Sequence, residues 1–266
     1  MRITYRSKDS KEYWTDRWDA IEADLPMTNI NKYPLKYALE VATNKEESIL
    51  EAGCGAGRIL RYFHDNGFAI RGIDYIEVAI EKLKKADPSL DVDVGDITDL
   101  KFKDESFHHV LAFGLYHNLE YGMEKAIQET NRVLKVGGFV CASFRADNIQ
   151  TKIQDYLASR KNKKSSNQES KCFHKINLTK KEFEELFINA GFKIKSTYPV
   201  ENMPFLYKFR FFRSRTHKNF NESKGRVEGY KLSLIGSMLQ SMLMKLFPSS
   251  FCNIYLIIAQ KNEVPN

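Results

Sequence analysis

Residues 48–57 read Ser-Ile-Leu-Glu-Ala-Gly-Cys-Gly-Ala-Gly, and this stretch decides the fold of the chain. An apolar run leads to an acidic residue, Glu51, and glycines then occupy three alternate positions, Gly53, Gly55 and Gly57. A segment with a helical pattern follows. The order predicts a strand, a glycine turn and a helix. Because glycine has no side chain, backbone N–H groups of such a turn can come close to a ligand.

The spacing of the glycines separates two kinds of nucleotide-binding turn. A dinucleotide-binding fold has the pattern G-x-G-x-x-G, with a pyrophosphate on the helix N-terminus. Here Arg58 stands where the third glycine of that pattern would be, and the carboxylate of Glu51 would repel a pyrophosphate. The pattern E-x-G-x-G-x-G after an apolar strand instead resembles motif I of class I S-adenosylmethionine-dependent methyltransferases. A glycine-rich turn without a ligand is the alternative interpretation.

The composition is that of an ordinary globular domain. The chain has 266 residues, of which 42% are hydrophobic and 28% charged, which suits one α/β domain with insertions. The polar N-terminus predicts no signal peptide, and no apolar run is long enough to predict a membrane span, so we expect a cytoplasmic protein. The four cysteines form no C-x-x-C pair, which predicts a reducing compartment without metal or disulfides.

The net charge of +7 is concentrated in two inserts. Residues 160–181 carry eight Lys or Arg and one acid, and residues 204–226 carry seven and one, so the rest of the chain is net negative. Such inserts indicate either an anionic partner or solvated loops.

Apolar runs alternate with helical patterns, which predicts a βαβ sheet. The expected strands are residues 48–52, 69–73, 91–94, 109–113, 138–144, 192–198 and 253–260. The expected helices are residues 57–66, 77–86, 122–134 and 179–190. The last helix opens with a capping box, Thr179 and Glu182, and ends at Gly191. Gly137-Gly138 predicts a tight turn between a helix and a strand.

The resemblance implies the arrangement of these elements: an α/β fold with a Rossmann-like seven-stranded sheet of order 3-2-1-4-5-7-6, strand 7 antiparallel. We expect one domain, with residues 46–200 and 251–262 as the core. Residues 1–45 form an N-terminal helical cap, and residues 202–250 form a helical insert between strands 6 and 7. Apolar residues spaced by three and four predict an amphipathic helix in that insert: Leu232, Ile235, Leu239, Met242 and Leu246. The polar stretch 161–168 predicts a loop.

Acidic residues follow the second and third expected strands. Asp74 lies about 20 residues beyond the glycine turn, where an acid can accept from both ribose hydroxyls. Dehydrogenases bind ribose with an acid at the same position, so Asp74 indicates a nucleoside ligand but does not identify it. The resemblance implies that Asp96 accepts from the adenine amino group and that Ile97 packs on the ring. Asp96 could instead cap a turn, and Asp99 offers an alternative register.

Further cofactor contacts follow from the resemblance. Phe113-Gly114-Leu115 comes after the fourth strand, where the family places residues beside the methionine moiety. The segment 132–138 resembles the family's R-x-L-K-P-G-G, with Val136 in place of proline. The complete expected cofactor-binding set is Tyr13, Trp14, Arg17, Glu51, Ala52, Gly53, Gly55, Gly57, Asp74, Tyr75, Asp96, Ile97, Phe113, Gly114 and Leu115.

The cap carries the sequence Tyr13-Trp14-Thr15-Asp16-Arg17-Trp18. Related enzymes fold such a segment over the cofactor. Arg17 could pair with the carboxylate of S-adenosylmethionine, and Tyr13 or Trp14 could face its sulfonium. The alternative is a helix whose aromatic rings pack on the sheet, which we expect for Trp18.

Methyl transfer from a sulfonium mostly requires alignment and exclusion of water, and a base only when the acceptor holds a proton. His117, just after the fourth strand, is the candidate general base, with a packing histidine as the alternative. His108 and His109 lie at the other end of that strand and are expected to be structural. His174 could line the acceptor site.

The sequence predicts a methyltransferase with S-adenosylmethionine as cofactor and a small or lipid-like acceptor. No N/D-P-P-Y/F tetrad and no Pro-Cys motif of base-modifying enzymes follows the strands, and residues 48–144 resemble the ubiquinone and menaquinone methyltransferases of the type 11 group. The aromatic and basic residues 203–213 could cover an amphiphilic site, contact an anionic membrane or stack on RNA. The other hypotheses are an RNA methyltransferase and a non-catalytic binding protein, and the chain could be a monomer or a homodimer.

Overall fold

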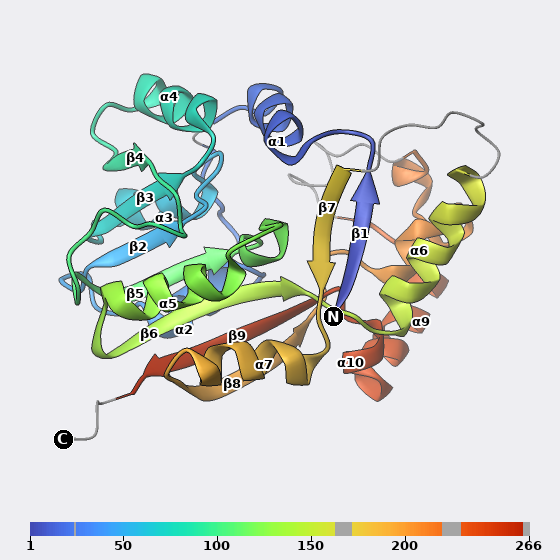
Figure 1. Ribbon diagram of the computed structural model, residues 1–266. Coiled ribbons are helices and arrows are strands. Elements are labelled where there is room, and N and C mark those ends of the chain that lie inside the picture. The colour runs from blue at the N-terminus through green and yellow to red at the C-terminus, as the bar shows by residue number, and fades with distance from the viewer. Residues whose placement is uncertain (24, 163–171, 220–229, 263–266) are drawn as a thin grey trace.

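The computed structural model describes residues 1–23, 25–162, 172–219 and 230–262. A seven-stranded sheet runs through it in the order β4-β3-β2-β5-β6-β9-β8, with β9 antiparallel to both of its neighbours (Figure 1). This is the expected order 3-2-1-4-5-7-6, and the prediction is confirmed. The strands are β2 (Ile49–Ala52), β3 (Ile70–Asp74), β4 (Val92–Val94), β5 (Phe107–Phe113), β6 (Leu134–Arg145), β8 (Phe192–Val200) and β9 (Ile254–Lys261).

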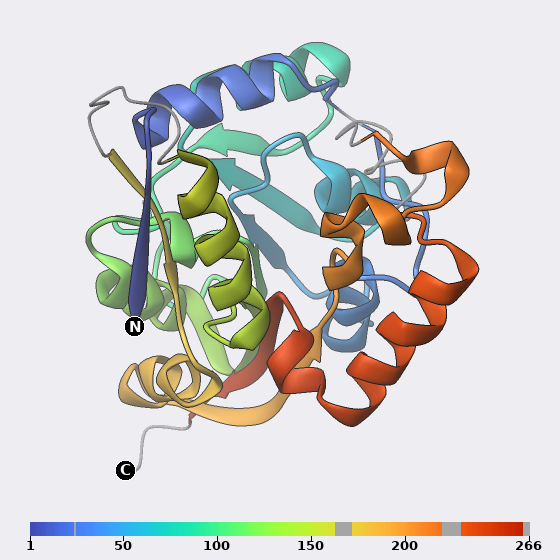
Figure 2. The ribbon, with the colours of Figure 1, turned by 90° about the vertical axis from the view of Figure 1, so that its right-hand side faces the viewer.

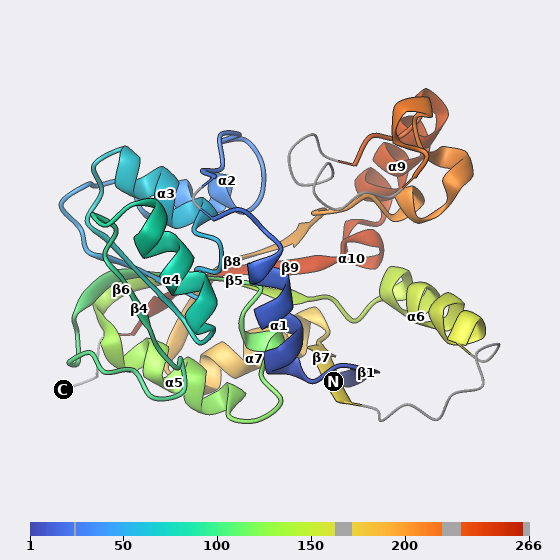
Figure 3. The ribbon, with the colours of Figure 1, turned by 90° about the horizontal axis from the view of Figure 1, so that it is seen from above.

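Helices cover both faces of the sheet, and Figure 3 shows them on opposite sides. On one face lie α2 (Leu35–Val41), α3 (Arg58–Asp65) and α4 (Glu77–Ala86), which pack against Ile49 and Leu111. On the other lie α5 (Met123–Val133) and α7 (Lys180–Asn189). Because both faces are covered, all four residues of the central strand β2 are buried, as is typical of parallel strands.

The N-terminal segment differs from the expected helical cap. It begins with a strand, β1 (Arg2–Arg6), which pairs antiparallel with β7 (Cys172–Asn177) to form a second, two-stranded sheet (Figure 2). The helix α1 (Ser10–Asp19) follows, held at its start by the Asp9 side chain. The sequence did not predict β1 or β7, because β1 places Ile3 and Tyr5 on an exposed side rather than in a buried apolar run.

Two local predictions have different outcomes. The capping box of Thr179 and Glu182 is present at the start of α7, so that prediction is confirmed. The prediction of a turn at Gly137-Gly138 is wrong, because α5 ends at Val133 and β6 begins at the next residue. Gly137 has a φ of 76° inside β6, where the pairing with β5 shifts register. The glycine therefore permits a bulge rather than a turn.

The insert before β9 contains the expected helix, α9 (Leu234–Leu246), but in an unexpected orientation. Its buried residues are Gly236, which lies against the carbonyl of Phe212, and Gln240, whose Oε1 accepts from Leu206 N at 3.0 Å. Apolar side chains face outward, with Leu234 80% exposed. The exposed apolar set is Leu234, Ile235, Met238, Leu239, Met242 and Leu246.

The remaining elements connect the strands of the sheet. They are α6 (Ile149–Asn162), α10 (Pro248–Phe251) and the short 3-10 helices η1 (Tyr116–Asn118), η2 (Phe205–Lys208), η3 (Arg210–Phe212) and η4 (Arg215–His217). Of the polar stretch 161–168, residues 163–168 lie outside the described part of the chain. No described helix is long and apolar enough to cross a bilayer.

Candidate active site

The predicted acids lie at one edge of the sheet. Because β2 pairs with β3 and β5 in parallel, the carboxyl ends of these strands meet. Glu51 is in β2, Asp74 ends β3, and Phe113 ends β5. Glu51 and Asp74 are buried, and they are close enough for the negative charge of Asp74 to raise the pKa of Glu51. The sheet topology therefore brings two of the three predicted acids together.

The glycine turn is held by Asp74. Gly53, Gly55 and Gly57 have φ angles of 73°, 52° and 73°, a region that glycine adopts more readily than other residues. Asp74 Oδ2 accepts from the N–H of Gly55 at 2.8 Å, and Oδ1 accepts from Ile76 N at 2.9 Å. The sequence predicted Asp74 as a ribose ligand but did not predict this bracing role, which depends on contacts between adjacent strands.

Glu51 carries an unsatisfied carboxylate oxygen. Its Oε2 is buried and has no hydrogen-bond partner among the described residues. Burial raises the pKa of Glu51 to about 8, the backbone N–H of Leu60 lowers it, and Asp74 raises it further. A buried carboxyl oxygen without a donor is costly, so a cationic ligand group at this point would be stabilised.

Asp96 and Ile97 follow β4, whose Val94 pairs with Asp74, so they come just after the carboxyl end of β4. Asp96 is exposed, and its Oδ1 accepts from both the N–H and the hydroxyl of Thr98 at 2.8 Å. Its Oδ1 therefore caps a turn, and the contact of Asp96 with adenine stays a prediction. Ile97 is 5% exposed and packs in the core. A hollow of about 350 Å³ lies beside Asp96; its lining includes Ile73, Leu100 and Phe102.

Trp18 covers the glycine turn. A Cβ added at Gly55 would lie 2.5 Å from the Trp18 ring, so the ring is in close contact with the backbone there. Trp14 stacks on Trp18 at 5.5 Å between ring centroids. The end of α1 is fixed by Lys82, whose Nζ donates to the carbonyl of Trp18 at 3.0 Å. Core packing was expected for Trp18; instead it lies on the turn, a placement that its aromatic character alone could not indicate.

The other predicted cofactor contacts lie in or next to β2, β3 and β5, or in α1. Leu115 lies against Gly53, 3.1 Å from the position of an added Cβ. Arg17 Nη1 donates to the hydroxyl of Tyr13 at 3.0 Å. Tyr75 is 56% exposed, and the side chain of Ala52 is fully buried in the core.

His117 is a buried histidine next to Gly114. Its Cε1 is 3.7 Å from a Cβ added at Gly114, and its Nδ1 is buried without a hydrogen-bond partner in the described part of the chain. Burial lowers the pKa of His117 well below its ordinary value, and Arg145, Lys175 and His174 lower it further. The imidazole is therefore neutral at physiological pH.

The two histidines at the start of β5 have structural contacts. His109 Nε2 lies 2.7 Å from Glu47 Oε2, and His108 Nδ1 accepts from Ser48 N at 3.0 Å. Both lie at the opposite end of the strand from Gly114, as expected.

Comparison with known proteins supports a methyltransferase. Residues 50–142, which run from β2 to β6, match the family model described as a methyltransferase domain. This match and the order of the sheet support a class I S-adenosylmethionine-dependent methyltransferase. The matched segment contains Glu51, the glycine turn, Asp74, Asp96 and His117.

Two curated relatives illustrate the similarity. A probable S-adenosylmethionine-dependent methyltransferase of Mycolicibacterium smegmatis is 26% identical over 152 residues, covering 57% of this chain and 54% of that protein. A tRNA (carboxymethyluridine(34)-5-O)-methyltransferase of Arabidopsis thaliana is 32% identical over 132 residues, covering 49% of this chain and 32% of that protein. The chain thus matches about half or less of the length of these methyltransferases.

Solved structures share the fold over nearly the whole chain. A putative methyltransferase of Haloferax volcanii, solved in complex with a methyltransferase activator, has a TM-score of 0.64 at 15% identity and covers 98% of this chain and 100% of that one. A methyltransferase of Methanosarcina mazei has a TM-score of 0.59 at 20% identity, covering 87% and 99%. At these identities the likeness concerns the methyltransferase fold alone.

The cofactor of this family, S-adenosylmethionine, fits the residues present. The buried Oε2 of Glu51 has no partner among the described residues and could accept from an ammonium, and the three glycines keep the turn free of β-carbons.

Trp18 should report on occupancy of this methyltransferase site. The only two tryptophans of the sequence are Trp14 and Trp18, both in α1. Because the Trp18 ring touches Gly55, we expect S-adenosylhomocysteine to change the tryptophan emission. The change should persist in Trp14→Phe and be lost in Trp18→Phe, as measured by fluorescence titration. Equal changes in both variants would contradict the placement of Trp18.

Proposed function

We propose that this protein transfers the methyl group of S-adenosylmethionine to an oxygen, nitrogen or carbon of a small or amphiphilic acceptor. One observation supports the proposal above all: the buried, unpaired carboxyl oxygen of Glu51 stands beside Asp74 at the glycine turn. A site of this kind favours a ligand that carries both a cation and hydroxyl groups, and S-adenosylmethionine carries both.

Different residues bind different parts of the cofactor. Glu51 binds the amino end, Asp74 the ribose hydroxyls, and Asp96 the adenine edge, with Ile97 below the ring. The turn glycines permit close backbone approach, with Ala52 and Tyr75 flanking the acids. Arg17, with Tyr13 and Trp14, closes the site from α1, and Phe113, Gly114 and Leu115 border the methionine moiety.

The protein's part in the reaction is alignment. The sulfonium supplies an electrophilic methyl, and the chain holds the acceptor in line with it and excludes water. His117 is the proposed proton acceptor, but burial first, and then Arg145 and Lys175, disfavour its charged form. A negative charge on the acceptor would offset those cations and make His117 a stronger base.

The surface of the insert 202–250 supports a class of acceptor. The exposed apolar side of α9 and the basic residues of η2 and η3 support an amphiphilic acceptor or contact with a membrane surface. The similarity to a tRNA methyltransferase favours a second candidate, in which the basic inserts hold RNA. A cytoplasmic location is part of the proposal, as is a monomeric or homodimeric state.

Calorimetry and a transfer assay test the function. We expect the protein to bind S-adenosylhomocysteine with a dissociation constant of roughly 1–100 μM, the range of many cofactor complexes. Labelled S-adenosylmethionine is then offered with three acceptor pools: small metabolites, lipid extract and unmodified tRNA. Label in either of the first two supports the proposal, and label in tRNA alone establishes the RNA candidate. Absence of S-adenosylhomocysteine binding would remove the cofactor assignment.

A further inference from the structure

A group of basic side chains gathers around His117, which lies next to Gly114 of the proposed site. Arg145 ends β6, His174 and Lys175 are in β7, and His117 is in η1. These elements pack together: β7 contacts both η1 and β6, and a bridge joins Ala146 to Leu178. Arg145, Lys175 and His174 are basic neighbours of His117, and Lys208 of η2 is a charged neighbour of both Arg145 and Lys175.

The buried nitrogens of this group lack partners. Arg145 Nε and His117 Nδ1 are buried without a hydrogen bond to any described residue, and so are Nε and Nη1 of Arg6, a neighbour of His174. Burial lowers the pKa of Arg145, which shows that its environment disfavours the charge. Unpaired buried guanidinium nitrogens are costly, and an oxyanion is the partner that satisfies them best.

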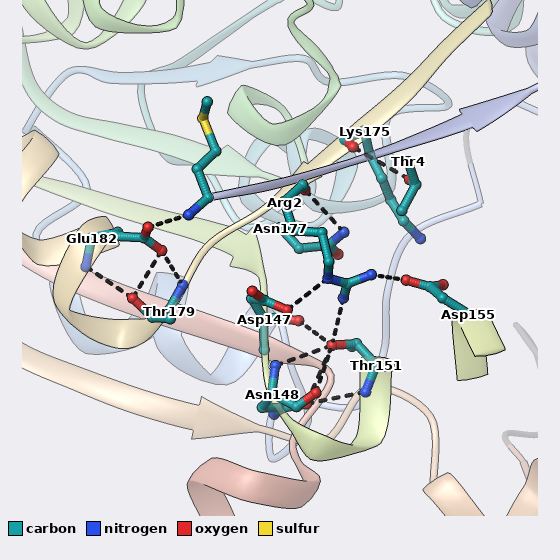
Figure 4. A network of polar contacts seen from close by, with 12 residues as sticks. Arg2, Thr4, Asp147, Asn148, Thr151, Asp155, Lys175, Asn177, Thr179 and Glu182 are labelled. Carbon is teal, nitrogen blue, oxygen red and sulfur yellow. Dashed lines mark hydrogen bonds and ion pairs between the residues drawn. The ribbon is translucent and has the colours of Figure 1, made fainter. Parts of the chain in front are cut away.

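The nearby carboxylates do not neutralise the group. Figure 4 shows Arg2 bonded to Asp155, to Asp147 at 2.8 Å and to Thr151 at 3.1 Å, with Lys175 close to Thr4. Asp155 is the acidic neighbour of Arg145 and Lys175, but Arg2 already forms an ion pair with it. Within the described ranges, positive charge is therefore left over at Arg145 and Lys175.

We propose that Arg145, Lys175 and Lys208 bind an oxyanion group, carboxylate or phosphate, of the methyl acceptor, next to His117. The inference rests on the proposed function in assigning this anion to the acceptor. Bound there, the anion would pair the unsatisfied nitrogens of Arg145. It would also offset the positive field that, after burial, disfavours the charged form of His117, so the bound acceptor would make His117 a stronger base.

The site should depend on pH through Lys175. Burial first, and then Arg145, lower the pKa of Lys175 to about 7, with Lys208 and Arg2 acting in the same direction and Asp155 against them. His174 has a pKa lowered to about 3 and His117 is neutral, so neither changes charge near neutrality. Raising the pH through 7 removes the Lys175 charge and should weaken anion binding.

Sulfate is a suitable probe, because its charge is constant near neutrality. We expect saturable sulfate binding by calorimetry to protein saturated with S-adenosylhomocysteine, weakening about tenfold from pH 6 to pH 8. Lys175→Arg should bind without this pH dependence, and Arg145→Met should lose at least about tenfold in affinity. Lys101→Met, whose side chain is 82% exposed beside Asp99, is the matched control and should behave as wild type. Malonate in place of sulfate distinguishes a carboxylate site from a phosphate site.

The outcomes separate this inference from the proposed function. S-adenosylhomocysteine binding without sulfate or malonate binding would overturn the inference and leave the proposed function standing. Anion binding without S-adenosylhomocysteine binding, measured on the free protein, would overturn the function and keep the anion site. Equal losses in Arg145→Met and Lys101→Met would also overturn the inference. Thermal denaturation checks whether Arg145→Met is folded. If it is not, Lys208→Met replaces it and should show the same loss of sulfate affinity.

Discussion

Replacing Asp74 with alanine is expected to weaken S-adenosylhomocysteine binding roughly 100-fold, or about 2.7 kcal/mol. The carboxylate is the proposed partner of the ribose hydroxyls, and it also accepts from the backbone N–H groups of Gly55 and Ile76. Its loss therefore removes a ligand contact and releases the glycine turn at the same time. Calorimetric titration of the variant measures the effect.

The bracing role predicts a second change in the same variant. Two backbone donors lose their acceptor, so the free energy of unfolding should fall by about 1–3 kcal/mol even without cofactor. Asp65→Ala is the matched control, because Asp65 is a partly exposed residue of α3 paired with Arg61. It should cost under about 0.5 kcal/mol and leave binding unchanged. Wild-type affinity in Asp74→Ala would exclude Asp74 from the cofactor site.

Glu51→Gln is expected to stabilise the free protein at alkaline pH while impairing cofactor binding. The pKa of Glu51 rises from 4.5 in the unfolded chain to about 8 in the folded one, chiefly by burial. The stabilising contribution of its neutral form is therefore complete below about pH 4.5 and is lost as the pH rises towards 8. Glutamine stays neutral, so the variant should be more stable than wild type at pH 8, by about 2 kcal/mol, and nearly equal at pH 5.

Cofactor binding should remove the proton from the Glu51 carboxyl group. An ammonium beside the carboxylate favours its charged form, so at pH 7 the wild type should release a proton when S-adenosylhomocysteine binds. The calorimetric enthalpy would then vary with the ionisation enthalpy of the buffer, and it should not vary in Glu51→Gln. The variant should also bind at least about tenfold more weakly. A buffer-independent enthalpy in the wild type would argue against an ammonium at Glu51.

The sheet and the glycine turn could be predicted because each depends on a short stretch of the sequence. Apolar runs at β2, β3 and β5 predict buried strands, and the glycines at 53, 55 and 57 predict a turn with positive φ angles, which the structure has. The acids at positions 51 and 74 follow the same logic, since residues at the carboxyl ends of adjacent parallel strands must meet.

Other features depend on contacts between distant segments. The pairing of β1 with β7, the placement of Trp18 on Gly55 and the exposure of the apolar side of α9 each involve partners far apart in sequence. Periodicity in α9 correctly predicts a helix, but it cannot say which side faces the protein, because Gly236 and Gln240 rather than leucines fit against η3 and η2.

The sequence by itself determined the glycine turn, the buried strands beside it and two of the acids at the cofactor end, because spacing along one chain controls turns and strand ends. The resemblance to class I methyltransferases supplied the order of the strands. Only the tertiary structure decided that Glu51 keeps an unpaired oxygen, that Asp74 braces the turn, and that Arg145 and Lys175 meet beside His117. Burial and electrostatic neighbours are properties of the packed molecule, so no pattern in the linear sequence contains them.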